Sequence, residues 1–200
     1  PVVLDMRPTL HQQAKTQIIA FAAEGKAAVH RQVTRMPEVY TSVSASGLGE
    51  GVFQHQKDQD TDLIVIGTHG VQEGWDRIFS TNAAFLVDKV QSSILILPAT
   101  VEFQPLKTVC FATNLGKTDL VGARRLSNIL ATFQPKIDLL HVRLPHREQP
   151  PGLLDSFRRT FEQPRNGVKS TFTNVFGPVA TDGIFPYLKD HFHDLLVMVK

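Results

Sequence analysis

The chain has 200 residues, of which 42% are hydrophobic and 20% charged, and its formal net charge is +2 at pH 7. This composition is typical of a soluble globular protein with a real apolar core, and it excludes a disordered chain. So small a net charge gives no reason to expect nucleic acid or a membrane surface as a partner. No stretch approaches the roughly 20 apolar residues that a membrane span needs.

The single cysteine, Cys110, lies in the apolar run 108–112. One cysteine cannot form an intrachain disulfide, which fits a reducing compartment. A cysteine in such a run usually acts as a small hydrophobic side chain. We therefore expect a cytoplasmic protein in which Cys110 is buried.

Strand and helix patterns alternate along the first half of the chain. The continuous apolar run 62–66 is typical of a strand buried on both faces, as in a parallel sheet. Gly25 is a stop signal after a run of apolar residues at helical spacing. The expected elements are a helix over 9–24, strands over 27–33 and 39–43, a loop over 44–51 leading into a helix that ends near Gln59, a strand over 62–66, a helix over 82–90 and a strand over 93–97.

The same alternation begins again after a linker over 99–105. The expected elements are strands over 108–112, 137–142, 168–175 and 194–199, helices over 119–133, 153–161 and 183–191, and a proline-rich loop over 144–151. Alternating strands and helices predict an α/β fold: an open, Rossmann-like parallel sheet with helices on both faces. Residues 62–66 match 194–198, and this internal repeat predicts two tandem copies, a first domain over 1–100 and a second over 105–200.

The segment after Ile66 is the strongest functional signal. It reads Gly67-Thr68-His69-Gly70, then nine residues, then Ser80-Thr81 opening a helix at Asn82. A strand-to-helix connection lies at the carboxyl edge of a parallel sheet, where ligands bind. Glycines let the backbone approach a phosphate, and a helix N-terminus offers free N–H groups. The alternative is a tight turn with an N-cap at Ser80 or Thr81, which needs no ligand.

The stretch from Asp62 to Pro98 resembles the universal stress protein family. The ATP loop of that family is Gly, two residues, Gly, nine residues, then Gly followed by Ser or Thr. Ser80 stands in the place of the third glycine, where its Cβ would crowd a phosphate. The resemblance implies ATP as the ligand, bound by Gly67, Thr68, His69, Gly70, Ser80, Thr81 and Asn82.

The second copy departs further from the family. Val199 stands where the first copy has Gly67, and a β-branched residue suits that turn badly. Asn114 replaces the Asp that faces the adenosine in the family, while Val142 matches its adenine contact. The second domain therefore resembles a structural partner that has lost its ligand site.

The family sheet has the strand order 3-2-1-4-5. The first half of the chain offers counterparts of the third, fourth and fifth strands, so we expect the first domain to lack its first two. The second half stops before its own last strand. We expect the chain to be a fragment, or its sequence to omit segments.

The leading hypothesis is a stress-response protein that binds ATP in its first domain and works as a sensor or interaction module. The alternatives are an adenine-nucleotide-dependent enzyme of a related α/β fold and a ligand-free dimerisation module. We find no assembled nucleophile and base, and His191 and His193 have no evident third ligand for a metal. The uncharged apolar strand Ile94 to Leu97 predicts pairing with a second domain, in a dimer or an intramolecular pseudo-dimer.

Overall fold

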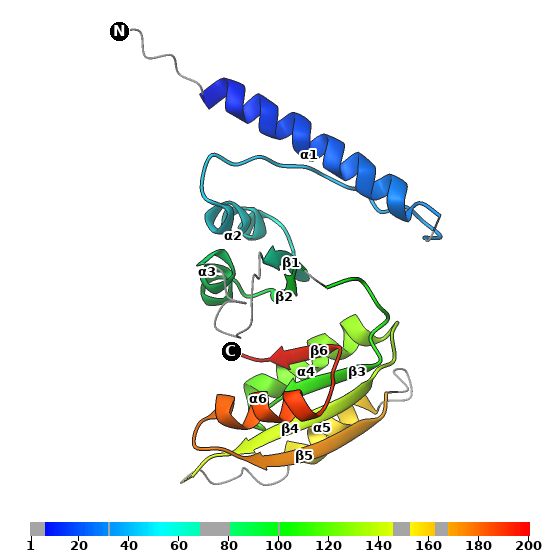
Figure 1. The fold of residues 1–200 in the computed structure, drawn as a ribbon, viewed down its shortest axis with the longest axis vertical. Helices are drawn as coiled ribbons and strands as arrows, with labels where there is room; N and C mark the ends of the chain where they lie inside the picture. The colour runs from blue at the N-terminus through cyan, green and yellow to red at the C-terminus, as the bar shows by residue number, and fades with distance from the viewer. Residues whose placement is uncertain (1–6, 32, 69–80, 100, 146–152, 163–167) are drawn as a thin grey trace. The chain divides into compact units, whose positions relative to one another are not determined.

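The computed structural model describes residues 7–31, 33–68, 81–99, 101–145, 153–162 and 168–200. The chain divides into two compact units, Pro1–Glu102 and Phe103–Lys200 (Figure 1). Within the described ranges, none of the helices combines the length and the apolar character that a membrane crossing requires.

The first unit contains a small parallel sheet packed against two helices. Its elements are α1 (Arg7–Val29), α2 (Leu48–Asp58), β1 (Leu63–Thr68), α3 (Thr81–Lys89) and β2 (Ser93–Pro98). The two strands are parallel, with Ile64 opposite Ile94. Ile64 and Ile66 are buried against Ala83 and Leu86 of α3. The strands predicted over 62–66 and 93–97 and the helix predicted over 82–90 are therefore confirmed.

Two predicted strands of the first unit are wrong. Residues 27–29 continue α1, and no strand forms over 39–43, where all but one residue is exposed. Gly25 does not stop the helix, because one glycine costs a helix only about 1 kcal/mol relative to alanine. An extended run becomes a strand only when a neighbouring strand pairs with it, and among the described residues β1 and β2 pair only with each other.

The second unit is a four-stranded parallel sheet between helices. Its elements are β3 (Thr108–Ala112), α4 (Lys117–Leu130), β4 (Lys136–Arg143), α5 (Leu153–Phe161), β5 (Ser170–Phe176), α6 (Ala180–Asp190) and β6 (Leu195–Met198). The strand order is β5-β4-β3-β6, and every pairing is parallel. This order corresponds to 3-2-1-4, the first four strands of the expected order, and the α/β class is confirmed.

Each face of the second sheet has its own core. Helices α4 and α5 cover one face, where Phe111 lies 6.0 Å from each of Phe157 and Phe161 between ring centroids. Helix α6 covers part of the other face, where Ile184 packs against Cys110 and the ends of β3 and β4. The two central strands, β3 and β4, are buried on both sides because both sides meet helices.

Helix α6 begins at Ala180, three residues before the predicted start. Pro186 therefore lies inside the helix, where its missing N–H leaves one helical hydrogen bond unmade. The glycine in this helix allows close packing on the sheet. A Cβ at Gly183 would lie 2.6 Å from Cγ1 of Val142.

Candidate functional site

The predicted phosphate loop begins at the carboxyl end of a parallel strand. Gly67 and Thr68 are the last residues of β1, and Thr81 is the first residue of α3. Asn82, in the first turn of α3, is half-buried. The remaining predicted site residues, His69, Gly70 and Ser80, lie outside the described residues.

Gly67 and Thr68 face opposite sides of the sheet. A Cβ added at Gly67 would meet no described atom within 4 Å, so a side chain there would have room. Thr68 is 3% exposed and lies on the same face as Ile64 and Ile66, the face that α3 covers. Its carbonyl accepts a hydrogen bond from the N–H of Ala99 at 3.1 Å, whereas its hydroxyl has no hydrogen-bond partner among the residues that the structure describes.

A buried hydroxyl without a partner is unusual, because a lost hydrogen bond costs about 1–3 kcal/mol. The Thr68 hydroxyl lies at the strand end that precedes α3, on the face of the sheet that this helix covers. The N-terminus of a helix attracts anions through its free N–H groups and its dipole. An oxyanion placed there would give the Thr68 hydroxyl an acceptor.

The corresponding edge of the second unit satisfies its own polar groups. Asp119, buried in the first turn of α4, accepts hydrogen bonds from the Thr113 hydroxyl and from the N–H of Asn114, both at 2.7 Å. The Thr113 hydroxyl oxygen in turn accepts from the N–H of Leu115 at 2.8 Å. The turn after β3 is therefore held by its own side chains, and Asn114 contributes its backbone rather than its amide.

The side chains around this edge of the second unit are structural in the same way. His141 is buried, with Nδ1 2.8 Å from the carbonyl oxygen of Thr113. Val142 packs in the core beneath α6. The side chain of Val199 lies against α4, so close that a Cβ at Gly122 would be 2.5 Å from it. These contacts need no ligand.

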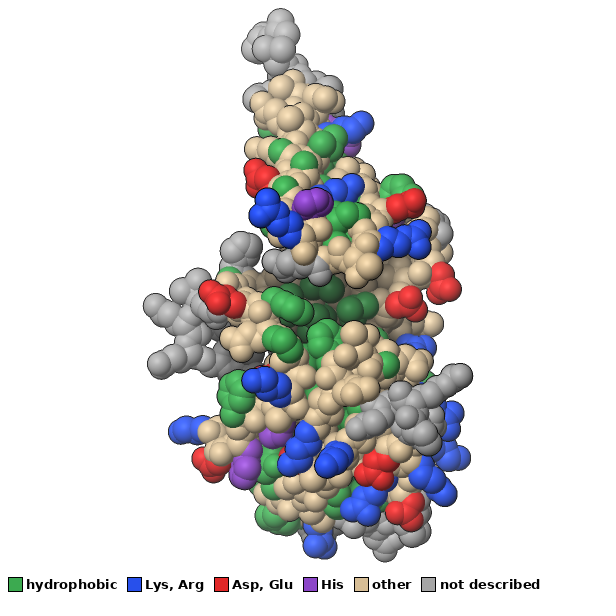
Figure 2. All heavy atoms as spheres, turned by 90° about the vertical axis from the view of Figure 1, so that its right-hand side faces the viewer, with side chains coloured by type: hydrophobic (Ala, Val, Ile, Leu, Met, Phe, Trp, Pro, Cys, Tyr) green, Lys and Arg blue, Asp and Glu red, His purple; other side chains and the backbone are tan. Residues whose placement is uncertain are grey.

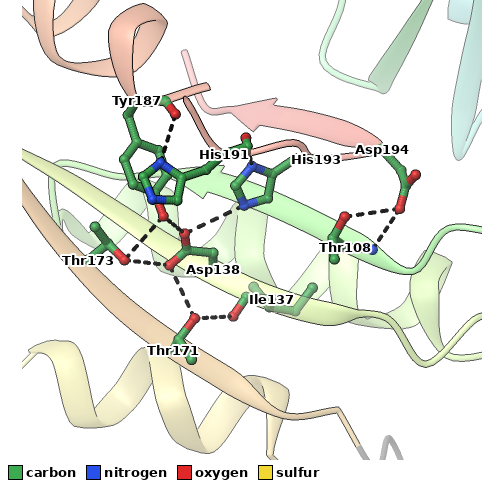
Figure 3. A network of polar contacts seen from close by, with 9 residues as sticks. All are labelled: Thr108, Ile137, Asp138, Thr171, Thr173, Tyr187, His191, His193 and Asp194. Carbon is green, nitrogen blue, oxygen red and sulfur yellow. Dashed lines mark hydrogen bonds and ion pairs between the residues drawn. The ribbon is translucent and has the colours of Figure 1, made fainter. Parts of the chain in front are cut away.

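A buried carboxylate organises a polar network at the opposite, amino edge of the second sheet (Figure 3). Asp138 of β4 accepts hydrogen bonds from the hydroxyls of Tyr187 at 2.5 Å, Thr173 at 2.9 Å and Thr171 at 3.2 Å. His193 Nε2 lies 3.5 Å from the same carboxylate. The network therefore joins β4, β5, α6 and the connection that leads to β6.

This network changes the acidity of two neighbouring groups. Burial, followed by the hydrogen bond to Asp138, raises the pKa of Tyr187 above its ordinary value. Burial, with the nearby charge of Asp138, raises the pKa of Cys110 to about 12. Cys110 is fully buried, as predicted, and at neutral pH it is an unreactive thiol.

Asp138 and Tyr187 were not among the residues predicted from the sequence. The signal was a lone charged residue in the apolar run 137–142, because a charge in a buried strand requires partners. His191 stacks on Tyr187 with ring centroids 4.2 Å apart, while His193 turns toward Asp138. Within the described ranges, no group of three or more His, Cys, Asp or Glu residues is placed to hold a metal ion.

Comparison with known proteins finds no matching family model and no matching curated protein. A crystal structure of a universal stress protein in complex with cAMP is similar at 17% identity and a TM-score of 0.39, covering 46% of this chain and 72% of that one. The structure of protein Rv1636 from Mycobacterium tuberculosis H37Rv is similar at 18% identity and a TM-score of 0.38, covering 48% and 72%. At such low scores, the function of this chain has to follow from its own residues.

Proposed function

We propose that the first unit binds an adenine nucleotide, ATP in particular, at the carboxyl end of β1. The observation that carries the proposal is the position of Gly67 and Thr68 at the end of β1, the strand that precedes α3 in the chain. The orphaned hydroxyl of Thr68 fits this ligand, because a phosphate oxygen would accept its hydrogen bond. The phosphate would be held by the loop from Gly67 to Gly70 and by Ser80, Thr81 and Asn82.

In this proposal the protein is a cytoplasmic stress-response sensor or interaction module and not an enzyme. The second unit acts as a structural partner, since the polar groups of its carboxyl edge already bond to one another. Ile94 and Ile96 are half-buried against the core of their own unit. Pairing of β2 with a second domain, in a dimer or pseudo-dimer, remains part of the proposal.

The test uses two variants, and the first is expected to change stability and ATP binding in opposite directions. Thr68→Val keeps the shape of the side chain and removes the unpaired hydroxyl. It should raise the free energy of unfolding of the ligand-free protein by about 1 kcal/mol and weaken ATP binding. A merely structural threonine would give the first effect without the second. Urea titration and isothermal titration calorimetry with Mg-ATP measure the two quantities.

Gly67→Val is the second variant, and Gly47→Val is its matched control. Both glycines leave open space around an added Cβ, so neither change should disturb packing. Gly47 is the N-cap residue of α2 and is not one of the predicted site residues. Loss of ATP binding in Gly67→Val alone supports the site. Equal binding by both variants would place the nucleotide elsewhere, and no binding by the unchanged protein would favour the ligand-free module.

A further inference from the structure

In the part of the chain that the structure describes, the sheet of the first unit is covered by helices on one face. Helices α2 and α3 pack against the face that holds Ile64. The opposite face, which we call the open face, holds Leu63 and Val65 of β1 and Leu95 and Leu97 of β2. Val65 is 56% exposed. Because parallel sheets usually have helices on both faces, the open face lacks the cover that such a sheet normally has.

The open face is apolar and uncharged. None of the residues that β1 and β2 place on it carries a charge. Figure 2 looks onto the first unit from the side away from α2 and α3, and it shows hydrophobic side chains gathered where these two strands lie. Exposed apolar surface costs about 25 cal/mol per Å², so an apolar cover over this face is favoured.

Helix α1 of the same unit is exposed nearly all round. Between residues 9 and 29, every residue except Ala14 and Ala22 is exposed. Phe21 is 76% exposed. A protein helix draws most of its stability from the packing of an apolar face. A helix of 23 residues that is exposed in this way therefore needs a surface to pack against.

The larger apolar side chains of α1 include a stripe along one side of the helix. They recur three, four or eight residues apart, which is the spacing of neighbours on a helical face. The members of this α1 stripe are Leu10, Ala14, Ile18, Phe21 and Val29. The charged residues of the same stretch, Lys15, Glu24 and Lys26, lie off the stripe. The stripe and the open face are therefore alike in chemistry, since both are apolar and uncharged.

The dimensions and the connection allow α1 to reach the open face of its own chain. A helix is about 10 Å across, and neighbouring strands lie about 4.8 Å apart, so one helix can cover two strands. Residues 30–47 join α1 to α2, and those that the structure describes form neither helix nor strand. A connection of this length spans up to about 60 Å when extended, whereas a six-residue strand such as β1 is about 20 Å long.

We propose that α1 docks its stripe on the open face of β1 and β2 in its own chain, as a strap that closes over the sheet. The described arrangement is then the undocked one. The connection holds α1 at an effective concentration on the order of millimolar, which favours the helix of the same chain over that of a second copy. This inference is independent of the proposed nucleotide site.

The test is the accessibility of a cysteine introduced by Val65→Cys. Native Cys110 adds no fast reaction, because it is fully buried and has a pKa of about 12. The new thiol should react with a disulfide reagent about tenfold faster in Val65→Cys/Phe21→Asp, where a charge interrupts the stripe, than in Val65→Cys alone. Tenfold corresponds to a docking free energy of about 1.4 kcal/mol. The control Val65→Cys/Ala23→Asp places the same charge on the opposite side of α1 and should keep the slow rate.

Equal rates in all three proteins would overturn the proposal, and so would equal acceleration by the two aspartates. Slow labelling that is lost on dilution would assign the cover to α1 of a second copy. Circular dichroism checks that α1 stays helical in each variant.

A second measurement needs no aspartate. A short bismaleimide should join Ile18→Cys to Val65→Cys within one chain, and it should not join Ala23→Cys to Val65→Cys. The absence of the first link, or equal yields of the two, would also refute docking of the stripe.

Discussion

The hydrogen bond between Tyr187 and Asp138 should be among the most stabilising polar contacts of the second unit. Tyr187→Phe removes one donor from a buried carboxylate that keeps its bonds to Thr171 and Thr173. Hydrogen bonds to charged groups contribute about 1.5–3 kcal/mol. We expect a loss of about 1.5 kcal/mol, at the low end of that range, because the carboxylate retains other donors.

Asp138→Ala removes the carboxylate that accepts hydrogen bonds from the hydroxyls of Thr171, Thr173 and Tyr187. Breaking a buried charged network costs about 3–5 kcal/mol, and we expect about 3 because two of the hydroxyls have weaker alternatives. Thr171 lies 3.5 Å from the carbonyl of Ile137, and Thr173 lies 3.5 Å from Tyr187. The double variant Asp138→Ala/Tyr187→Phe should lose about 3 kcal/mol of unfolding free energy rather than the sum of the two single losses. The difference is a coupling energy of about 1.5 kcal/mol.

Urea unfolding followed by circular dichroism measures these differences. Tyr40→Phe is the control, since Tyr40 is 86% exposed and bonds to Glu38 at the surface. A Tyr187→Phe variant as stable as this control, or strictly additive losses, would refute the central role of Asp138.

Two further outcomes follow from the packing of the second unit. Gly183→Ala should destabilise the second unit by about 1 kcal/mol, because the new Cβ would lie 2.6 Å from Val142. The better helix propensity of alanine does not offset this contact. Gly25→Ala has open space around the new Cβ in α1, so it should be stabilising in the same urea titration. Cys110, with a pKa of about 12, should react with a disulfide reagent at pH 8 only as fast as the unit opens, and rapid labelling of the folded protein would show that the thiol is accessible.

The sequence alone predicted most of the elements, because runs of apolar residues leave a strong pattern. The apolar runs 62–66 and 194–198 became β1 and β6, and the helix over 153–161 has the predicted bounds. The expectation that 62–66 is buried on both faces was wrong, since alternate residues of β1 are exposed, Val65 by 56%. The carboxyl-edge position of Gly67 followed from the same reasoning, since the residue after a buried parallel strand has to lie at that edge.

The tertiary structure decided everything that depends on a partner distant in sequence. Residues 39–43 have a strand-like pattern but no described neighbouring strand, so they remain extended coil. The bonds of Asp138 come from residues 33 to 49 positions away, and no local pattern reveals them.

Charge shows the same division between sequence and structure. Composition determined a net charge of +2, but folding turns Asp119 and Asp138 inward. A side chain's burial depends on which strands pair and in which register, and a single chain's sequence states neither directly.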